Sequence, residues 1–209
     1  MIELFGSALV TFLVIIDPPG CAPIFASLTR GAPAAYRRSM AIRSSAIAWA
    51  ILLFFALLGR PMLHALGISL ASFRIAGGIM LFMIALDMVF ERRTQRREER
   101  AQSIEGDAEH HDISVFPMAM PMIAGPGSIA SAMLWVSRAD GAAATLTVLA
   151  AITTVMLITM AALLAAPAIL RLMGERIEAV ITRILGVILT ALAAQFVIDG
   201  LKQSFPQLA

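Results

Sequence analysis

The chain has 209 residues, of which 59% are hydrophobic and only 14% charged, and its formal net charge is +2. A soluble domain carries about 25% charged residues, so this chain has too few charges to cover a water-exposed surface and is predicted to lie in the lipid bilayer. The small net charge, with no basic stripe interleaved with aromatic residues, argues against a nucleic-acid partner. The sole cysteine, Cys21, excludes an intramolecular disulfide and a multi-cysteine metal site.

Six apolar stretches divide the chain, and each has about the 20 residues that a membrane-spanning helix needs. They run over residues 4–28, 40–60, 68–90, 114–136, 143–170 and 180–201. Proline and glycine interrupt the first and fourth stretches, whereas the other four are typical of continuous helices. No Lys or Arg precedes Asp17, so a cleaved signal peptide is not expected. The predicted fold is an all-α membrane protein with six transmembrane segments, of which segments 1 and 4 are broken or re-entrant.

The only long polar stretch, 91–112, separates the third segment from the fourth. It holds seven acidic and five basic residues, which favours a solvated connector. His110 and His111 at its end have no nearby cysteine or third histidine, so no metal site is predicted. The chain is expected to fall into a first half, 1–90, a cytoplasmic polar linker, 91–112, and a second half, 113–209.

The distribution of Lys and Arg predicts the orientation in the membrane, because cytoplasmic connections carry an excess of both. With the N-terminus placed outside, 12 of the 16 basic residues lie on the cytoplasmic side. The other 4 are Arg60, Arg74, Arg138 and Lys202. Both termini are therefore predicted to face outward, away from the cytoplasm, in a multi-pass membrane protein.

The two halves resemble each other in sequence. The Pro-Gly pair at 19–20 lies 107 positions before the Pro-Gly pair at 126–127, inside the first segment of each half. The tetrapeptide RIAG at 74–77 lies 109 positions before RILG at 183–186, at the start of each third segment. Because each half has an odd number of segments, the second half must be inverted in the membrane. Inverted repeats with broken helices are typical of many secondary transporters.

The first break is the stretch 17–23, with the sequence DPPGCAP. The apolar run before it would span about 20 Å as a helix, short of the roughly 30 Å hydrocarbon core. Asp17 is therefore expected at depth, where an unpartnered charge costs at least about 2.5 kcal/mol. In one interpretation Asp17 caps a helix that begins at Pro18. In a second, compatible interpretation Asp17 also contacts a substrate amine or a coupling cation. The candidate binding residues here are Asp17, Pro18, Gly20, Cys21 and Pro23.

The second break, around residues 121–128, has no carboxylate. Its small residues allow close backbone approach, and Ser128 is able to cap a helix or to donate a hydrogen bond. A half-helix that begins after Gly127 would present free N–H groups and the positive end of its dipole to a carboxylate. The candidate binding residues here are Gly125, Pro126, Gly127 and Ser128. The alternative is a re-entrant hairpin that only packs the two halves together.

Three charged residues are candidate charge partners. Arg74 and Arg183 occupy matching positions at the start of the third and sixth segments, and either would pair with Asp17 or Asp87. The alternative is that both arginines extend to the membrane interface.

Three motifs carry a resemblance to a known family: DPPGCAPIF at 17–25, FRIAGGI at 73–79, and the stretch 121–129 with its Gly-Pro-Gly. Together they are similar to the MarC family of bacterial and archaeal inner-membrane proteins, and the likeness covers essentially the whole chain. The resemblance implies six membrane segments and a location in the cell inner membrane, where outward-facing termini are periplasmic. For some members it also implies transport of glycine, alanine and similar amino acids. The chain departs from the family pattern at Cys21, where asparagine is usual, and at Arg60. If that amide binds substrate, Cys21 lacks its donor and acceptor, and a different selectivity is expected.

The function predicted from these features is secondary transport of small neutral amino acids. The alternatives are an exporter or channel for another small polar solute, and a non-transporting membrane protein whose linker 91–112 recruits a partner. No Ser-His-Asp spacing, Walker loop, HExxH or Rossmann fingerprint occurs, so no enzyme activity is expected. No cofactor is predicted, and H+ or Na+ is the candidate coupling ion. The candidate partners are the lipid bilayer, a small polar solute and a second copy of the chain in a homo-oligomer.

Overall fold

The computed structural model describes residues 1–90 and 112–205, not including the side chains of 170–179, 181 and 182. Within these ranges the chain forms helices and no strands. The elements, in chain order, are α1 (Ile2–Ile16), α2 (Pro18–Leu28), α3 (Ala34–Ala65), α4 (Leu70–Val89), η1 (Ser114–Ile123), α6 (Pro126–Arg138), α7 (Ala142–Leu164) and α8 (Ala166–Ser204). The predicted linker 91–112 lies outside the described residues except for Asp112.

Five of the described helical stretches are long and apolar enough to cross a membrane. They are Ile2–Leu28 (which joins α1 and α2), Ala34–Ala65, Leu70–Val89, Ala142–Leu164 and Arg183–Ser204. The elements η1 and α6 add a sixth span when they are counted together, and they meet at a bend of 57°. The predicted all-α membrane class is therefore confirmed, with five or six candidate spans.

The first segment is interrupted at Asp17, as the sequence predicts. Asp17 has a left-handed backbone conformation (φ 58°, ψ 66°), which is uncommon for a residue with a side chain. It ends α1 by donating its N–H to the Leu13 carbonyl, and it serves as the N-cap of α2. Pro18 and Pro19 follow. Because proline has no N–H and fits only the first turn of a helix, the chain cannot continue α1 and starts a new helix instead.

The fourth segment is less regular than the first. Phe116 and Met120 have extended backbones inside η1 (φ −127°, ψ 128° and φ −133°, ψ 128°). Each of them precedes a proline, Pro117 or Pro121, and a residue before proline is pushed out of the helical region. Regular helix resumes at Pro126, where α6 begins. The predicted interruption of this segment is therefore confirmed.

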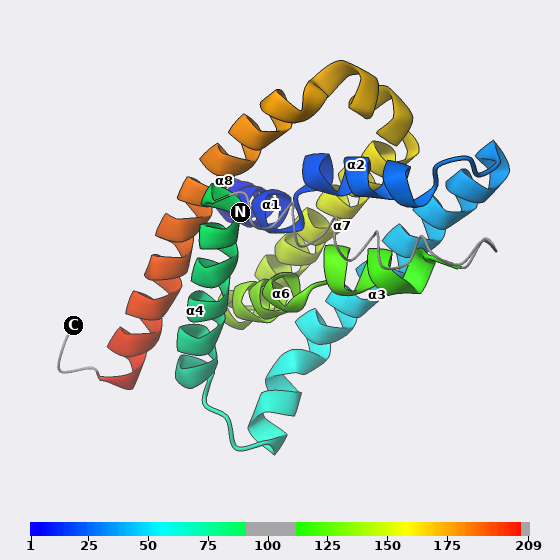
Figure 1. Ribbon diagram of the computed structural model, residues 1–209. Coiled ribbons are helices and arrows are strands. Elements are labelled where there is room, and N and C mark those ends of the chain that lie inside the picture. The colour runs from blue at the N-terminus through cyan, green and yellow to red at the C-terminus, as the bar shows by residue number, and fades with distance from the viewer. Residues whose placement is uncertain (91–111, 206–209) are drawn as a thin grey trace.

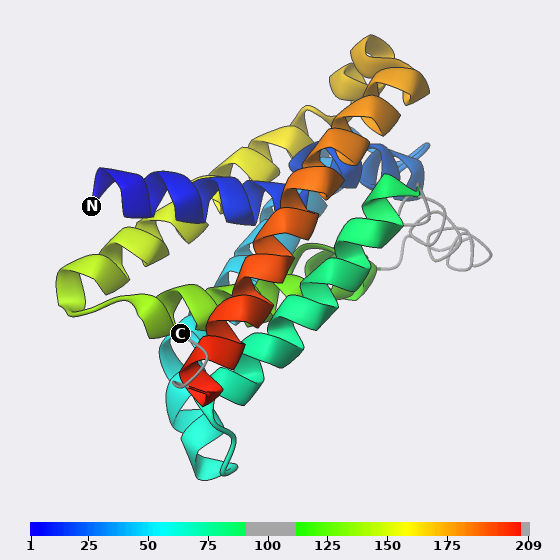
Figure 2. The same ribbon diagram turned by 90° about the vertical axis from the view of Figure 1, so that its left-hand side faces the viewer.

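Glycines hold α4 and α8 in close antiparallel contact along one side of the molecule (Figures 1 and 2). A Cβ at Gly78 would lie 2.7 Å from the Val197 side chain and 2.9 Å from the Ala193 carbonyl oxygen. Towards the other end of the pair, a Cβ at Gly186 would lie 3.0 Å from the Val89 side chain. Only a residue without a Cβ allows the two backbones to approach this closely.

The two halves of the chain are interleaved. The elements α1 and α2 pack on α7, whereas η1 and α6 pack on α3. In addition, α2 contacts α8 and α6 contacts α4. Each broken segment thus packs on helices of the other half, and α1 and α6 lie between the α4–α8 pair and α3 in the view of Figure 1. This arrangement buries Asp17, Gly20 and Cys21 at the first break and Gly125, Gly127 and Ser128 at the second.

One predicted boundary is wrong. The fifth segment was expected over 143–170, but α7 ends at Leu164, and the next helix, α8, begins at Ala166 and continues through the connection expected around 171–179. Pro167 explains the early end, because proline is tolerated in the first turn of a helix but not in its interior. Hydropathy predicts which part of a helix lies in lipid, but it does not predict where the helix itself begins or ends.

Candidate functional site

Asp17 lies at the first break, buried, with only 2% of its surface exposed. One oxygen of its carboxylate, Oδ1, accepts a hydrogen bond from the Gly20 backbone N–H at 3.2 Å. A Cβ at Gly20 would overlap this carboxylate, and the Asp17 Cγ would be only 2.9 Å away. Glycine at position 20 therefore gives the carboxylate room to lie over the first turn of α2, and the predicted capping role of Asp17 is confirmed.

Cys21 forms the remaining hydrogen bonds of the first break. Its thiol donates a hydrogen bond to the Ile16 carbonyl at 3.4 Å, and its backbone N–H donates to the Asp17 carbonyl at 3.0 Å. In an unbroken helix the Ile16 carbonyl would accept from the Gly20 N–H, which the Asp17 side chain takes instead. The fully buried thiol thus satisfies the carbonyl that the break exposes.

The second break repeats this hydrogen bond with a hydroxyl. Ser128 is 3% exposed and donates through Oγ to the Ile123 carbonyl at 2.9 Å. Donor and acceptor are five residues apart, as they are for Cys21 and Ile16. A Cβ at Gly125 would lie 2.5 Å from the Pro121 carbonyl oxygen, so this turn also needs a residue without a side chain.

The two helix starts differ in the donors that they leave open. In α2, Pro18 and Pro19 have no N–H, and the N–H groups of Gly20 and Cys21 are both taken by Asp17. In α6, among the residues that the structure describes, no acceptor pairs with the backbone N–H of Gly127 or of Ser128. Two unused donors at the start of a helix form a place where an anion or a carbonyl oxygen binds favourably.

The two breaks lie next to each other. A Cβ at Gly127 would meet the side chains of Ile84 at 2.5 Å, Leu81 at 3.4 Å and Ile15 at 3.7 Å. Ile15 lies in the last turn of α1, two residues before Asp17. Gly127 of the second break therefore packs against α1 just before the first break, with apolar side chains of α1 and α4 around it.

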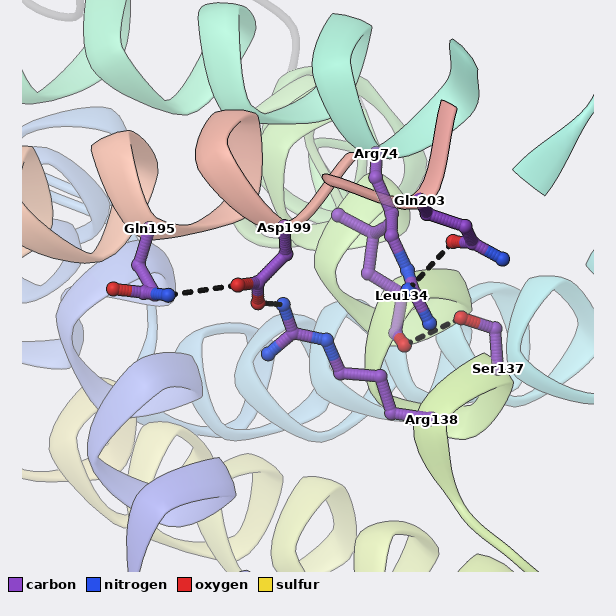
Figure 3. A network of polar contacts seen from close by, with 7 residues as sticks. All are labelled: Arg74, Leu134, Ser137, Arg138, Gln195, Asp199 and Gln203. Carbon is purple, nitrogen blue, oxygen red and sulfur yellow. Dashed lines mark hydrogen bonds and ion pairs between the residues drawn. The ribbon is translucent and has the colours of Figure 1, made fainter. Parts of the chain in front are cut away.

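The three predicted charge partners lie on α4 and α8, and the pairing of Asp87 and of Arg183 stays a prediction. Arg74 donates a hydrogen bond to Gln203, near the end of α8, at 2.8 Å (Figure 3). Asp87 is half-buried on α4, and Arg183 is exposed on α8.

A polar network that sequence reasoning missed surrounds Arg74 (Figure 3). Arg138, the last residue of α6, forms an ion pair with Asp199 of α8 and lies over the Phe196 ring at 4.6 Å. Gln195 donates to the other Asp199 oxygen at 2.7 Å. Arg138 and Asp199 are 61 positions apart, and no pattern within one segment predicts such a pair. Among the described residues, no group of three or more His, Cys, Asp or Glu side chains is placed to hold a metal ion.

The chain matches the profile described as MarC family integral membrane protein over residues 2–205. It is 37% identical over 201 residues to a UPF0056 membrane protein of Methanocaldococcus jannaschii, covering 96% of this chain and 97% of the relative. It is 34% identical over 195 residues to the UPF0056 membrane protein YhcE of Escherichia coli, covering 93% and 90%. No solved structure matches the chain. With its apolar helices, this protein is a multi-pass integral membrane protein and belongs to the MarC family.

Proposed function

We propose that the protein is a secondary transporter of small neutral amino acids, such as glycine and alanine, with its binding site at the two helix breaks. One observation carries the proposal: the first break holds a buried carboxylate, the second holds unused backbone donors, and Gly127 of the second packs against Ile15, two residues before Asp17. A buried charge in a membrane protein is costly, and it is retained where it serves a substrate or an ion.

The two breaks suit the two ends of a zwitterion. Asp17 supplies negative charge for an ammonium group or for a coupling cation, H+ or Na+. The N–H groups of Gly127 and Ser128, at the positive end of the α6 dipole, suit a carboxylate. The apolar side chains of Ile15, Leu81 and Ile84 lie around Gly127, and an apolar lining suits amino acids with neutral side chains.

The same proposal includes two inverted repeats. The hydrogen bond from Cys21 to Ile16 recurs 107 positions later as the bond from Ser128 to Ile123. The contact between Gly78 and Val197 has a counterpart between Gly186 and Val89, in which each glycine and each valine is shifted by 108 positions. The exchange of packing partners, α1 and α2 with α7 and η1 and α6 with α3, also favours a twofold relation.

The proposed orientation keeps both termini on the periplasmic side of the cell inner membrane and the linker 91–112 in the cytoplasm. Two contacts support the placement of both termini on one side of the membrane. Met1 is within 3.5 Å of Thr147 at the start of α7, which the short stretch 139–141 joins to the end of α6. At that end of α6 lies Arg138, whose partner Asp199 is near the end of α8.

Counterflow of labelled alanine and glycine into proteoliposomes tests the proposal, with Asp17→Asn as the key variant. Asparagine caps helices as well as aspartate does, so this change removes the charge and keeps the cap. Asp140→Asn, at an exposed position, is the matched control. We expect saturable counterflow that Asp17→Asn abolishes and Asp140→Asn preserves. Unsaturable flux would favour a channel, and no flux from folded protein would favour the partner-recruiting alternative.

A further inference from the structure

Unpaired polar atoms gather along one helix of the second half. Among the described residues, four buried side-chain atoms have no hydrogen-bond partner: Ser45 Oγ, Arg74 Nε, Ser131 Oγ and Trp135 Nε1. Ser131 and Trp135 are on α6, one turn apart, and are 0% and 7% exposed. Arg74 lies beside the end of α6, near Leu134 and Arg138 (Figure 3). Three of the four unpaired atoms thus follow a single helix.

These positions form one stripe of α6. At about 100° per residue, Ser128, Ser131, Trp135 and Arg138 fall within an arc of about 80°. The neighbouring faces of α6 are occupied otherwise, because Leu134 packs on Gly77 of α4 and Met133 packs on Gly59 of α3. We call these four residues the α6 stripe. It begins at the open N–H of Ser128 and ends at the ion pair of Arg138.

The α6 stripe has the length of a path from the membrane centre to its surface. Ten residues separate Ser128 from Arg138, and a helix rises about 1.5 Å per residue, which gives about 15 Å. This distance is half of the roughly 30 Å hydrocarbon core. Exposure increases towards Arg138, whose side chain is 24% exposed while Ser131 is fully buried.

At its outer end the stripe carries surplus positive charge. Two guanidinium groups, those of Arg74 and Arg138, lie near a single carboxylate, Asp199 (Figure 3). The ion pair between Arg138 and Asp199 joins α6 to α8 across this end. The unpaired groups along the stripe, the Ser131 hydroxyl and the Trp135 indole N–H, and the unpaired Nε of Arg74 at the outer end are all able to donate. Donors without acceptors call for a solute rich in acceptor oxygens.

We infer that the α6 stripe lines the route by which a carboxylate-bearing solute passes between the outer end of the protein and the helix breaks. In this structure the ion pair of Arg138 with Asp199 closes the route. The solute's carboxylate replaces Asp199 on Arg138, beside Arg74, and then moves inward over Trp135 and Ser131 to the donors of Ser128. The inference deepens the proposed function and rests on it for the identity of the solute.

Thiol labelling tests the route directly. In a Cys21→Ser background, Ser131→Cys on the stripe is compared with Met133→Cys, which is 5% exposed in this structure but faces α3. Burial alone predicts that neither thiol reacts with a small water-soluble methanethiosulfonate reagent. The route predicts that Ser131→Cys reacts at least tenfold faster than Met133→Cys, and that adding Asp199→Asn accelerates only the former. Equal rates at the two positions would overturn the inference.

The chemistry of the solute is tested in the same assay. We expect acetate and glycine to slow the labelling of Ser131→Cys, and methylamine to have no effect. Protection by methylamine but not by acetate would overturn the assignment of an acceptor-bearing solute. If Ser131→Cys does not fold, Trp49→Phe leaves Trp135 as the sole tryptophan, and acetate must then shift its fluorescence. An unchanged emission would contradict the route.

Counterflow and thiol labelling together distinguish a failure of the proposed function from a failure of the route. If alanine counterflow is absent but Ser131→Cys still labels faster and acetate slows it, the route stands and carries another carboxylate. If counterflow is present but the two thiols label equally, the amino acid transporter stands and the route along α6 is wrong.

Discussion

The two helix breaks end a helix in the same way and begin the next one differently. At both breaks a side chain five residues further along returns a hydrogen bond to the last carbonyl, from Cys21 to Ile16 and from Ser128 to Ile123. The start of α2 is then closed by two prolines and by Asp17. The start of α6 keeps the N–H groups of two residues open. The start of α2 shows that acceptors from the chain itself are able to satisfy a buried helix start, whereas the donors at the start of α6 lack such acceptors.

The difference between the breaks also separates two roles of the buried Asp17 carboxylate, as a helix cap and as a binding group. Asp17 stabilises α2 as a cap, which is a structural role that would exist without any substrate. Its charge is not needed for that role, because asparagine caps as well. Substitutions at matching positions of the two breaks therefore distinguish what each break needs for folding from what it offers to a solute.

The largest difference is expected between Gly20→Ala and Gly127→Ala, which change equivalent positions. A Cβ at Gly20 displaces the Asp17 carboxylate, so its cap is lost while its charge stays buried. We expect this to lower the free energy of unfolding by about 3 kcal/mol. A Cβ at Gly127 meets mainly the Cδ1 of Ile84, the end of a flexible side chain, and costs about 1 kcal/mol. Denaturant titration in detergent measures both, and an equal loss would show that the breaks are closed in the same way.

A smaller contrast is expected between Ser128→Ala and Cys21→Ala. Each change removes the donor to the carbonyl at the end of the preceding segment. A hydroxyl contributes about 1 kcal/mol through such a bond, whereas a thiol is a weak donor. The melting temperature should therefore fall more for Ser128→Ala than for Cys21→Ala. The comparison with Cys21→Ser, which is expected to keep or raise stability, separates the lost hydrogen bond from lost packing.

The sequence was most informative where one residue type has a single physical consequence. Proline and glycine predict the breaks correctly because Pro18 and Pro19 lack donors and Gly20 lacks a Cβ, whatever surrounds them. The capping role of Asp17 follows from the same local chemistry. The ion pair between Arg138 and Asp199 was missed, because it joins two helices whose relative position only the tertiary packing determines.

The boundary error at the end of α7 has a related cause. Apolar composition continues through 165–170, so hydropathy gave no signal there, while Pro167 needed a helix start just before it. The Gly-Pro-Gly sequence predicts free N–H groups at a helix start after Gly127, and in the structure α6 begins earlier, at Pro126. That Ile15 of the other half lies beside Gly127 depends on how the halves interleave, which the sequence does not determine locally.

The smallest effect is expected at Asp112. This exposed aspartate lies just before the second broken segment, whereas Asp17 lies within the first. Hydrogen bonds from the Ser114 hydroxyl and backbone N–H, with the nearby Arg43 guanidinium at 2.7 Å, hold the pKa of Asp112 below its ordinary value. A carboxylate whose pKa is lowered by folding adds stability above its unfolded pKa, and this stability is lost as the pH falls through the folded pKa.

Asp112→Asn should therefore lower the melting temperature slightly at pH 7, and the difference from the unsubstituted protein should shrink as the pH falls below about 4, near the unfolded pKa of aspartate. Because the Arg43 and Asp112 side chains are 52% and 45% exposed, high salt should reduce the difference at pH 7 as well. Asp140→Asn, exposed and outside this cluster, serves as the control. A difference that grows towards low pH would mean that the carboxylate of Asp112 destabilises the start of η1, and the parallel with the cap at Asp17 would then be wrong.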